Sequence, residues 1–240
     1  MKYRVTCLTP LLVGDGRWLA PIDYMVWKDQ VNVLDQPRIF RLLAKGPRLD
    51  GYLSQLKQSE KLDFASWGGF AQNFAGRRIP FEHASSTQFW ERQRGEMLFI
   101  PTFSAGPQGA FLPASALMGA LRTGVVAARL HPNALRDLAA RMQSDKPPRR
   151  PAEAIEHHAV GSPGASRMKT IGLSDSAPAP AAAFKVFLVR TSTLIARSGG
   201  FGLGWKVSPH GSVDGRRVEE STPLFAEMAA PGAVFEGRWR

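Results

Sequence analysis

Apolar and polar side chains alternate at the start of the chain, where Tyr3, Val5 and Cys7 are separated by Arg4 and Thr6. A period of two is typical of a strand with one face toward the core. The sequence therefore predicts that the chain begins with a half-buried strand.

A tight loop is expected in residues 8–18, because Gly14 and Gly16 flank an aspartate there. Such a loop could approach a phosphate closely, although a plain turn is the simpler explanation of two glycines. Two short strands are predicted in 23–34, followed by a helix in 35–43 that begins with an aspartate cap.

Helical spacing continues loosely through 49–56 and 64–74, and 77–94 is expected to be a loop with a short helix. The second stretch carries an aromatic stripe that either stacks on RNA bases or, as is more common, belongs to a core: Trp67, Phe70 and Phe74.

A longer helix is predicted in 111–130, with Pro113 in its first turn and the Ser115 hydroxyl as a cap. One side is apolar and should face the core: Ala114, Leu117, Leu121, Val125 and Ala128. A neighbouring strip carries Ser115, Met118, Arg122 and Arg129. The free N–H groups at the helix start and the two arginines could hold a phosphate chain; a surface helix with solvated arginines is the alternative.

Composition changes after a further helix predicted in 133–142. Residues 145–183 are rich in proline, alanine, serine and glycine and are predicted to be a linker or mobile loop. A strand is predicted in 184–194, and 233–240 is expected to form the last strand. Between them, the glycine-rich segment 197–206 either brings backbone close to phosphates or forms a turn between strands.

The formal net charge of +11 over 240 residues is spread along the chain rather than concentrated in a tail. This surplus favours an anionic partner such as nucleic acid or acidic lipid, bound through an attraction that weakens with salt. A basic protein without such a partner is the alternative. The single cysteine, Cys7, excludes an internal disulfide, and no apolar run approaches the length of a membrane span. We therefore expect a cytoplasmic protein with no membrane anchor.

Metal and nucleophile chemistry find no support in the sequence, so neither a metal nor another cofactor is predicted. The histidines at 83, 131, 157, 158 and 210 have no metal-ligand spacing, and no Gly-x-Ser-x-Gly or cysteine–histidine signature is present. Acid–base cleavage of RNA through its own 2′-hydroxyl would need one well-placed carboxylate or imidazole. The candidates for that role are Asp15, Asp23 and His83.

Residues 113–122 resemble a signature of the repeat-associated RAMP proteins of CRISPR effector complexes. That signature runs proline, small, serine, serine, leucine, lysine, glycine, alanine, leucine, arginine, and its counterparts here are Pro113, Ala114, Ser115, Ala116, Leu117, Met118, Gly119, Ala120, Leu121 and Arg122. Ala114 replaces the usual glycine and Met118 the usual lysine, and the second departure removes one expected phosphate contact.

Residues 8–43 also resemble the N-terminal part of the Csm-type RAMP subunit at the head of type III-A complexes, near the 3′ end of the CRISPR RNA. The matching features are Thr9-Pro10, Gly14-Asp15-Gly16, Asp23-Tyr24 and the Val31 to Asp35 strand. Leu12 stands where a histidine is usual. The GLSDS sequence at 172–176 and the glycine-rich segment 197–206 resemble further elements of the same subunit type.

The resemblance implies an α+β protein built on ferredoxin-like, RNA-recognition-type RAMP units. We expect residues 1–144 to form an N-terminal unit with a helical insertion. Residues 145–183 would be a linker or mobile loop, and 184–240 a C-terminal RAMP portion that is either a short form or a fragment.

The resemblance implies a structural subunit that binds CRISPR RNA, contacts backbone RAMP subunits, and has target RNA as a further candidate partner. The predicted RNA-binding residues are Ser115, Gly119, Arg122, Arg129, Gly14, Gly16, Arg17, Lys169, Arg197, Gly200, Gly202 and Lys206. No enzymatic activity is expected. A RAMP endoribonuclease and a basic protein-interaction module without RNA are the alternatives.

Overall fold

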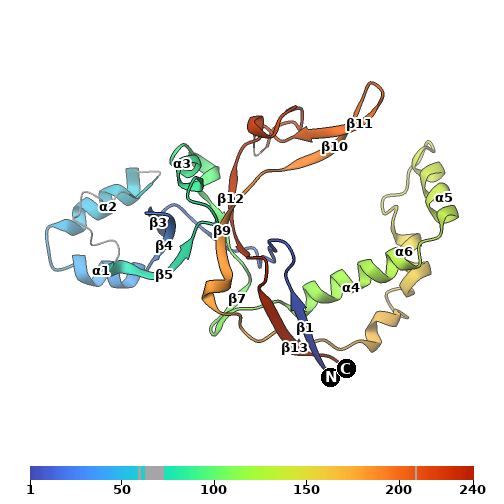
Figure 1. Cartoon of the computed structure of the whole chain (residues 1–240), viewed down its shortest axis with the longest axis horizontal. Helices are drawn as coiled ribbons and strands as arrows, with labels where there is room; N and C mark the ends of the chain where they lie inside the picture. The colour runs from blue at the N-terminus through green and yellow to red at the C-terminus, as the bar shows by residue number, and fades with distance from the viewer. Residues whose placement is uncertain (59–60, 63–72, 209) are drawn as a thin grey trace. The chain divides into compact units, whose positions relative to one another are not determined.

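The computed structural model describes residues 1–58, 61–62, 73–208 and 210–240 (Figure 1). The chain forms two compact units, and each is assembled from segments that are distant in the sequence. Unit 1 comprises Met1–Val5, Phe111–Ala179 and Val234–Arg240, and unit 2 comprises Thr6–Ala110 and Pro180–Ala233. These boundaries differ from the predicted division at 144 and 183, because both ends of the chain join the central segment in unit 1.

Unit 2 is organised around an antiparallel sheet of β3 (Tyr24–Trp27), β4 (Gln30–Leu34) and β5 (Ala75–Pro80). The two predicted strands in 23–34 are confirmed, with Lys28 at a positive φ of 46° in their connecting turn. Strand β5 corrects the expected loop in 77–94. Its arginines at 77 and 78 concealed a strand in which Ala75, Arg77 and Ile79 lie on the less exposed face, with Ile79 buried.

Both faces of this sheet are apolar, so each supports a core. One cluster contains Leu19, Tyr24, Val31, Ile79, Phe81, Trp90, Leu98, Ile100, Val186 and Phe225. The other lies under the first two helices and contains Met25, Leu34, Ile39, Leu43, Tyr52, Leu62 and Phe74. These helices are α1 (Gln36–Leu43) and α2 (Arg48–Gln58), and the predicted Asp35 cap accepts a hydrogen bond from the Arg38 N–H at 3.0 Å.

Unit 2 also contains four short strand pairs in the described residues. β2 (Trp18–Leu19) pairs with β6 (Ile100–Pro101), β7 (Ala105–Gly106) with β8 (Gly109–Ala110), β9 (Phe184–Val189) with β12 (Leu224–Ala229), and β10 (Ser192–Arg197) with β11 (Gly200–Trp205). The helical segments are α3 (Ser86–Glu91) and the 3-10 turns η3 (Gly95–Leu98), η5 (Ala181–Ala183) and η6 (Val218–Glu220).

Unit 1 pairs β1 (Lys2–Thr6) with β13 (Val234–Arg238) and adds three helices. These are α4 (Ala114–Ala128), α5 (Pro132–Met142) and α6 (Glu153–Val160), with a 3-10 turn η4 (Arg167–Thr170). Helix α6 corrects the prediction that 145–183 is linker or loop, since its last residues, Ala159 and Val160, are buried. The expected core face of α4 is also wrong: every residue of α4 is at least partly exposed, and Leu121 is 39% exposed.

The α+β class is therefore confirmed, with small antiparallel sheets rather than one large sheet. The ferredoxin-like arrangement of these strands stays a prediction.

An ion pair with one buried partner joins the β3–β4–β5 sheet to the β9–β12 strand pair. Glu227 on β12 is 1% exposed, and both of its oxygens accept hydrogen bonds from Arg77 on β5, at 2.6 and 2.9 Å. A two-pronged Arg–carboxylate contact is among the stronger side-chain interactions. Removal of Arg77 would leave the charge of Glu227 buried and unpaired, which is strongly destabilising.

We predict that Arg77→Met lowers the free energy of unfolding by about 3 kcal/mol, because Glu227 loses its counter-charge. Arg77→Met combined with Glu227→Leu should recover most of that loss. The control is Arg4→Met, since Arg4 and Glu236 form an exposed pair at 3.8 Å that is worth less than about 1 kcal/mol. Equal losses in urea denaturation for Arg77→Met and Arg4→Met would contradict the prediction.

Burial raises the pKa of Tyr24 to about 12, even though a hydrogen bond from the Trp90 indole partly opposes the shift. The Tyr24 hydroxyl donates to the Leu98 carbonyl at 2.6 Å. Above pH 10 an unfolded tyrosine loses its proton, while the folded one keeps it. Stability from this group is therefore complete below pH 10 and is lost as the pH rises toward 12.

We predict that the unfolding free energy of the wild type falls relative to Tyr24→Phe by about 1.4 kcal/mol between pH 8 and pH 11. Comparing the two proteins at each pH removes the contribution of other titrating groups. A constant difference across that range in urea titrations would show that Tyr24 ionises normally in the fold.

Candidate nucleic-acid interface

The start of α4 is held by a carboxylate from a distant part of unit 1. The Ala114 N–H donates to Asp175 Oδ1 at 2.8 Å, and α4 has Pro113 as its N-cap residue. The predicted Ser115 cap is therefore wrong: Asp175 supplies the acceptor. A carboxylate at this position also stabilises the positive end of the helix dipole. One of the N–H groups of the anion site expected near Ser115 is thus already engaged within the chain.

The two arginines of the predicted strip both reach toward α6. Arg122 Nη2 lies 2.5 Å from Glu156 Oε2, and Arg129 Nη1 donates to the Ala159 carbonyl at 2.6 Å. Both side chains of the Arg122–Glu156 pair are partly exposed, at 47% and 40%. Such exposed pairs contribute at most about 1 kcal/mol, so a phosphate can compete for the guanidinium.

Two other residues of unit 1 are predicted to bind RNA, Gly119 and Lys169. Gly119 lies on an open part of α4, where an added Cβ would meet no atom of the described residues within 4 Å. Lys169 lies in η4, and its ammonium donates to the Gly164 carbonyl at 2.9 Å. The RNA-binding role of these residues stays a prediction.

In unit 2, the predicted loop around Gly14 and Gly16 precedes strand β2. Gly16 adopts a φ of 83°, which favours glycine, and a Cβ there would meet open space among the described residues. Arg17 is paired with Asp15, at 3.5 Å between Nε and Oδ2, and its backbone N–H donates to the same carboxylate.

The glycine-rich segment 197–206 forms part of a β-hairpin. The interpretation of this segment as a turn between strands is therefore confirmed. Ser198 and Gly199 make the turn between β10 and β11, and Gly199 and Gly200 have φ of 95° and 144°. Arg197 folds back to donate to the Leu203 carbonyl at 2.8 Å, and its side chain fills the space beside Gly202. Lys206 follows the hairpin and is half-buried.

The face of this hairpin opposite to the glycines and Arg197 is apolar and exposed. Leu194 pairs with Leu203, Ala196 pairs with Phe201, and Phe201 is 79% exposed. This face was not predicted from the sequence, where the glycines alone suggested a loop. The strict alternation of glycine with Phe201, Leu203 and Trp205 was the available signal.

An exposed aromatic pair beside the Gly14–Gly16 loop was also missed. Trp18 is 58% exposed, and its ring meets Phe99 edge-on at a centroid distance of 6.3 Å. Of the aromatic residues predicted as a stacking stripe, Phe74 belongs to the core, and Trp67 and Phe70 lie outside the described residues. Aromatic rings that remain open to solvent can stack on bases.

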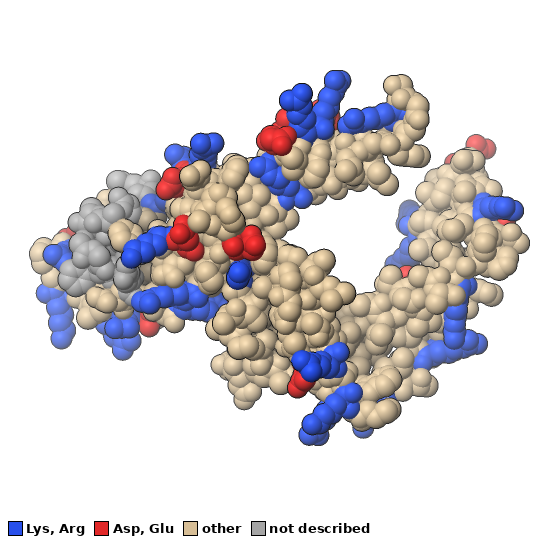
Figure 2. All heavy atoms as spheres, in the orientation of Figure 1, with Lys and Arg blue, Asp and Glu red and all other residues tan. Residues whose placement is uncertain are grey.

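The structure thus places the predicted residues in three groups: on α4 and η4 in unit 1, on the loop before β2, and on the β10–β11 hairpin in unit 2. Figure 2 shows Lys and Arg side chains exposed on the surface of both units.

The candidate acid–base residues are engaged in local turns. Asp23 accepts a hydrogen bond from the Ala20 N–H at 2.9 Å, Asp15 contacts Arg17, and His83 Nδ1 lies 2.7 Å from the Ser85 hydroxyl. Among the described residues, no three His, Cys, Asp or Glu side chains are close enough to hold a metal ion. None of the described helices combines the length and hydropathy needed to span a membrane.

No family model and no curated protein match the sequence. Solved structures do match it. Csm5 of T. onnurineus superposes with a TM-score of 0.66 at 18% identity, over 99% of this chain and 67% of that chain. The chain has the Csm5 fold. A chain of a Csm–crRNA–target RNA ternary complex from a type III-A CRISPR-Cas system matches with a TM-score of 0.64 at 18% identity, over 100% of this chain and 63% of its own length. The Csm5 fold thus extends over both units.

We predict that Asp175→Ala lowers the unfolding free energy by about 1 kcal/mol, the usual cost of losing a helix cap. Ser115→Ala should change it by less than about 0.5 kcal/mol, because the Ser115 hydroxyl does not cap α4. Urea denaturation of the two variants tests this assignment. A larger loss for Ser115→Ala than for Asp175→Ala would restore the original prediction.

Proposed function

We propose that this chain is a structural, RNA-binding subunit of a type III-A CRISPR ribonucleoprotein that acts in antiviral defence. It holds the 3′ part of the CRISPR RNA and contacts a neighbouring backbone subunit, with target RNA as a further partner. The observation that carries the proposal is the Csm5 fold, which covers 99% of the chain. The second matching structure is a chain from a complex that contains crRNA and target RNA, which supports RNA as the ligand.

The charge of the chain suits such a ligand. A net charge of +11 attracts a polyanion, and an arginine has five N–H donors. Arg122 and Arg197 each use one nitrogen on an acceptor within the chain, so other N–H groups remain for phosphates. These contacts grip the ribose–phosphate backbone without reading bases, as a subunit that accepts any guide sequence requires.

The proposed role is binding rather than catalysis. Asp15, Asp23 and His83 each hold a turn through the hydrogen bonds described above. Their replacement is therefore expected to affect local folding rather than RNA cleavage.

We predict that Arg122→Gln with Arg197→Gln weakens single-stranded RNA binding by about tenfold at moderate salt. Each lost phosphate contact should reduce the slope of log affinity against log salt by about 0.7. Fluorescence anisotropy across a salt series measures both quantities.

Glu156→Gln is the matched control, since it frees Arg122 from its carboxylate partner and should leave binding unchanged or strengthen it. Unchanged affinity and salt slope in the double arginine variant would refute these residues as phosphate ligands. Purification with partner proteins, followed by sequencing of any bound RNA, tests the function itself: an assembly free of CRISPR RNA would refute it.

A further inference from the structure

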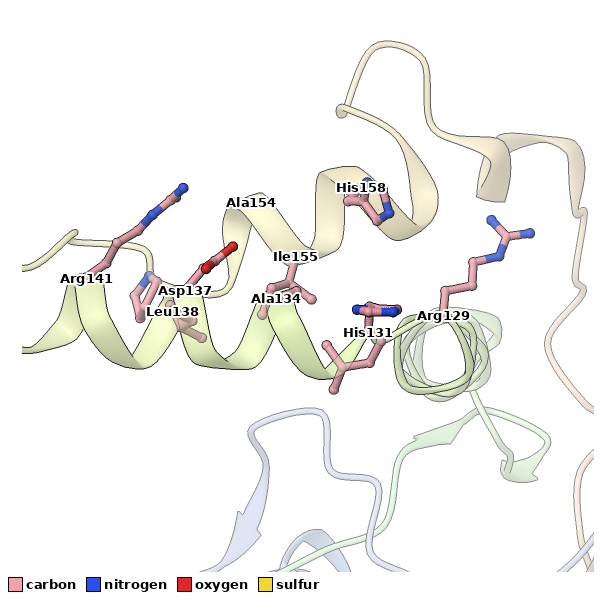
Figure 3. A pocket seen from close by; sticks show the side chains of 11 residues that line it. Arg129, His131, Ala134, Asp137, Leu138, Arg141, Ala154, Ile155 and His158 are labelled. Atoms are coloured by element: carbon pink, nitrogen blue, oxygen red, sulfur yellow. The ribbon is translucent and has the colours of Figure 1, made fainter.

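A pocket of about 290 Å³ lies in unit 1, between the end of α4, helix α5 and helix α6 (Figure 3). Four of its lining residues are basic or imidazole side chains, whereas one is acidic: Arg129, Arg141, His131, His158 and Asp137. Only Arg129 belongs to the residues predicted to bind RNA. The volume of the pocket is close to the lower limit of the roughly 300–1,000 Å³ that is typical of ligand pockets.

Three of these side chains gather at one end of the pocket. Figure 3 shows Arg129, His131 and His158 there, and Arg141 with Asp137 at the other end. The bond from Arg129 Nη1 to the Ala159 carbonyl, at 2.6 Å, fixes the guanidinium while leaving Nε and Nη2 available. The one carboxylate of the pocket is therefore placed away from the strongest concentration of donors.

His131 is held as a hydrogen-bond donor toward a ligand. It is the N-cap of α5, and its Nδ1 accepts from the Asn133 N–H at 3.3 Å. A neutral imidazole that accepts at Nδ1 carries its proton on Nε2, so this hydrogen bond assigns the tautomer. His158 on α6 forms no side-chain hydrogen bond with any residue the structure describes, which leaves both of its nitrogens available to a ligand.

The middle of the pocket is apolar. Ala134 and Leu138 of α5 and Ala154 and Ile155 of α6 line it. A ligand that fits must therefore combine an anionic group with a flat or apolar part.

We propose that this pocket binds a nucleotide through a phosphate monoester at Arg129, His131 and His158. The three donors come from the end of α4, the start of α5 and α6, so they lie on different sides of the pocket, which suits a tetrahedral oxyanion better than a planar carboxylate. The sugar or base lies on the apolar wall, and Asp137 accepts from a ribose hydroxyl. The nucleotide is the phosphorylated end of an RNA strand, which rests on the proposed function; a free nucleotide has the same chemistry.

The test compares a short RNA that carries a 3′-phosphate, the same RNA with a 3′-hydroxyl, and adenosine 3′-monophosphate. Each is measured by competition against a labelled RNA and by calorimetry, with the full chain. The phosphorylated RNA should bind about tenfold more tightly than the hydroxyl form. His158→Gln and His131→Asn should each remove most of that difference, and the asparagine retains a capping side chain for α5.

His157→Gln and Arg136→Gln are matched controls, because they lie on α6 and α5 without lining the pocket. Their preference for the phosphorylated RNA should equal that of the wild type.

The outcomes separate this inference from the proposed function. If RNA binds but a 3′-phosphate adds nothing, or if His158→Gln and His131→Asn retain the full preference, the pocket assignment is overturned while the RNA-binding function stands. If no RNA binds but adenosine 3′-monophosphate does, and His158→Gln abolishes that binding, the pocket stands and the proposed function fails. If none of the three probes binds, the inference is overturned.

Discussion

The arrangement of unit 1 depends on the hydrogen bond that the Asp175 carboxylate accepts from the first turn of α4. The segment around Asp175 pairs with the end of the chain, through the bonds between Gly172 and Arg240 and from the Ser174 N–H to Arg238. Its next residue, Ser176, exchanges hydrogen bonds with Leu112 just before α4 begins. One short stretch thus connects β13 to the helix start, and this fixes where α4 and its arginines can lie.

This constraint explains why α4 can remain largely exposed and still be ordered. A helix normally gains most of its stability from burying an apolar face. Here both ends of α4 are secured by specific polar contacts instead: Asp175 at its start, and Arg129 on the Ala159 carbonyl at its end. Between these points Leu121 remains exposed to solvent, and Arg122 is partly exposed beside Glu156.

The helices and strands that are stabilised by residues close to one another in the sequence were predicted from local sequence signals. The hairpin in 23–34 follows from its alternation, and α1 follows from the Asp35 cap three residues before Arg38. The elements that were missed depend on distant partners. Strand β5 looked like a polar loop because Arg77 finds its carboxylate 150 residues away, at Glu227. Helix α6 lies in a proline-rich segment whose composition resembles a linker.

The candidate site shows the same division. The choice of arginines and glycines rests on their suitability for a phosphate backbone and stays a prediction, whereas the partners that these residues have within the chain could not be predicted. Arg122 meets Glu156 across a separation of 34 residues, and no spacing rule relates the two. The histidines of the pocket likewise have no ligand spacing in the sequence, because His131 and His158 are brought to one end of it by different helices.

The proposed function and the proposed pocket ligand involve two kinds of contact with a nucleic acid, and the two differ in what they would contribute. Arg122 is partly exposed in its pair with Glu156, so a phosphate bound there would add affinity that salt screens strongly and that does not depend on the position along the strand. The pocket is a confined volume lined by donors. It would neutralise fewer phosphates than the exposed arginines, but it would hold one particular nucleotide of the strand. A chain with both kinds of contact could bind an RNA of any sequence and still fix its register. The exposed arginines would determine the affinity for the strand, and the pocket would determine the position of the strand end.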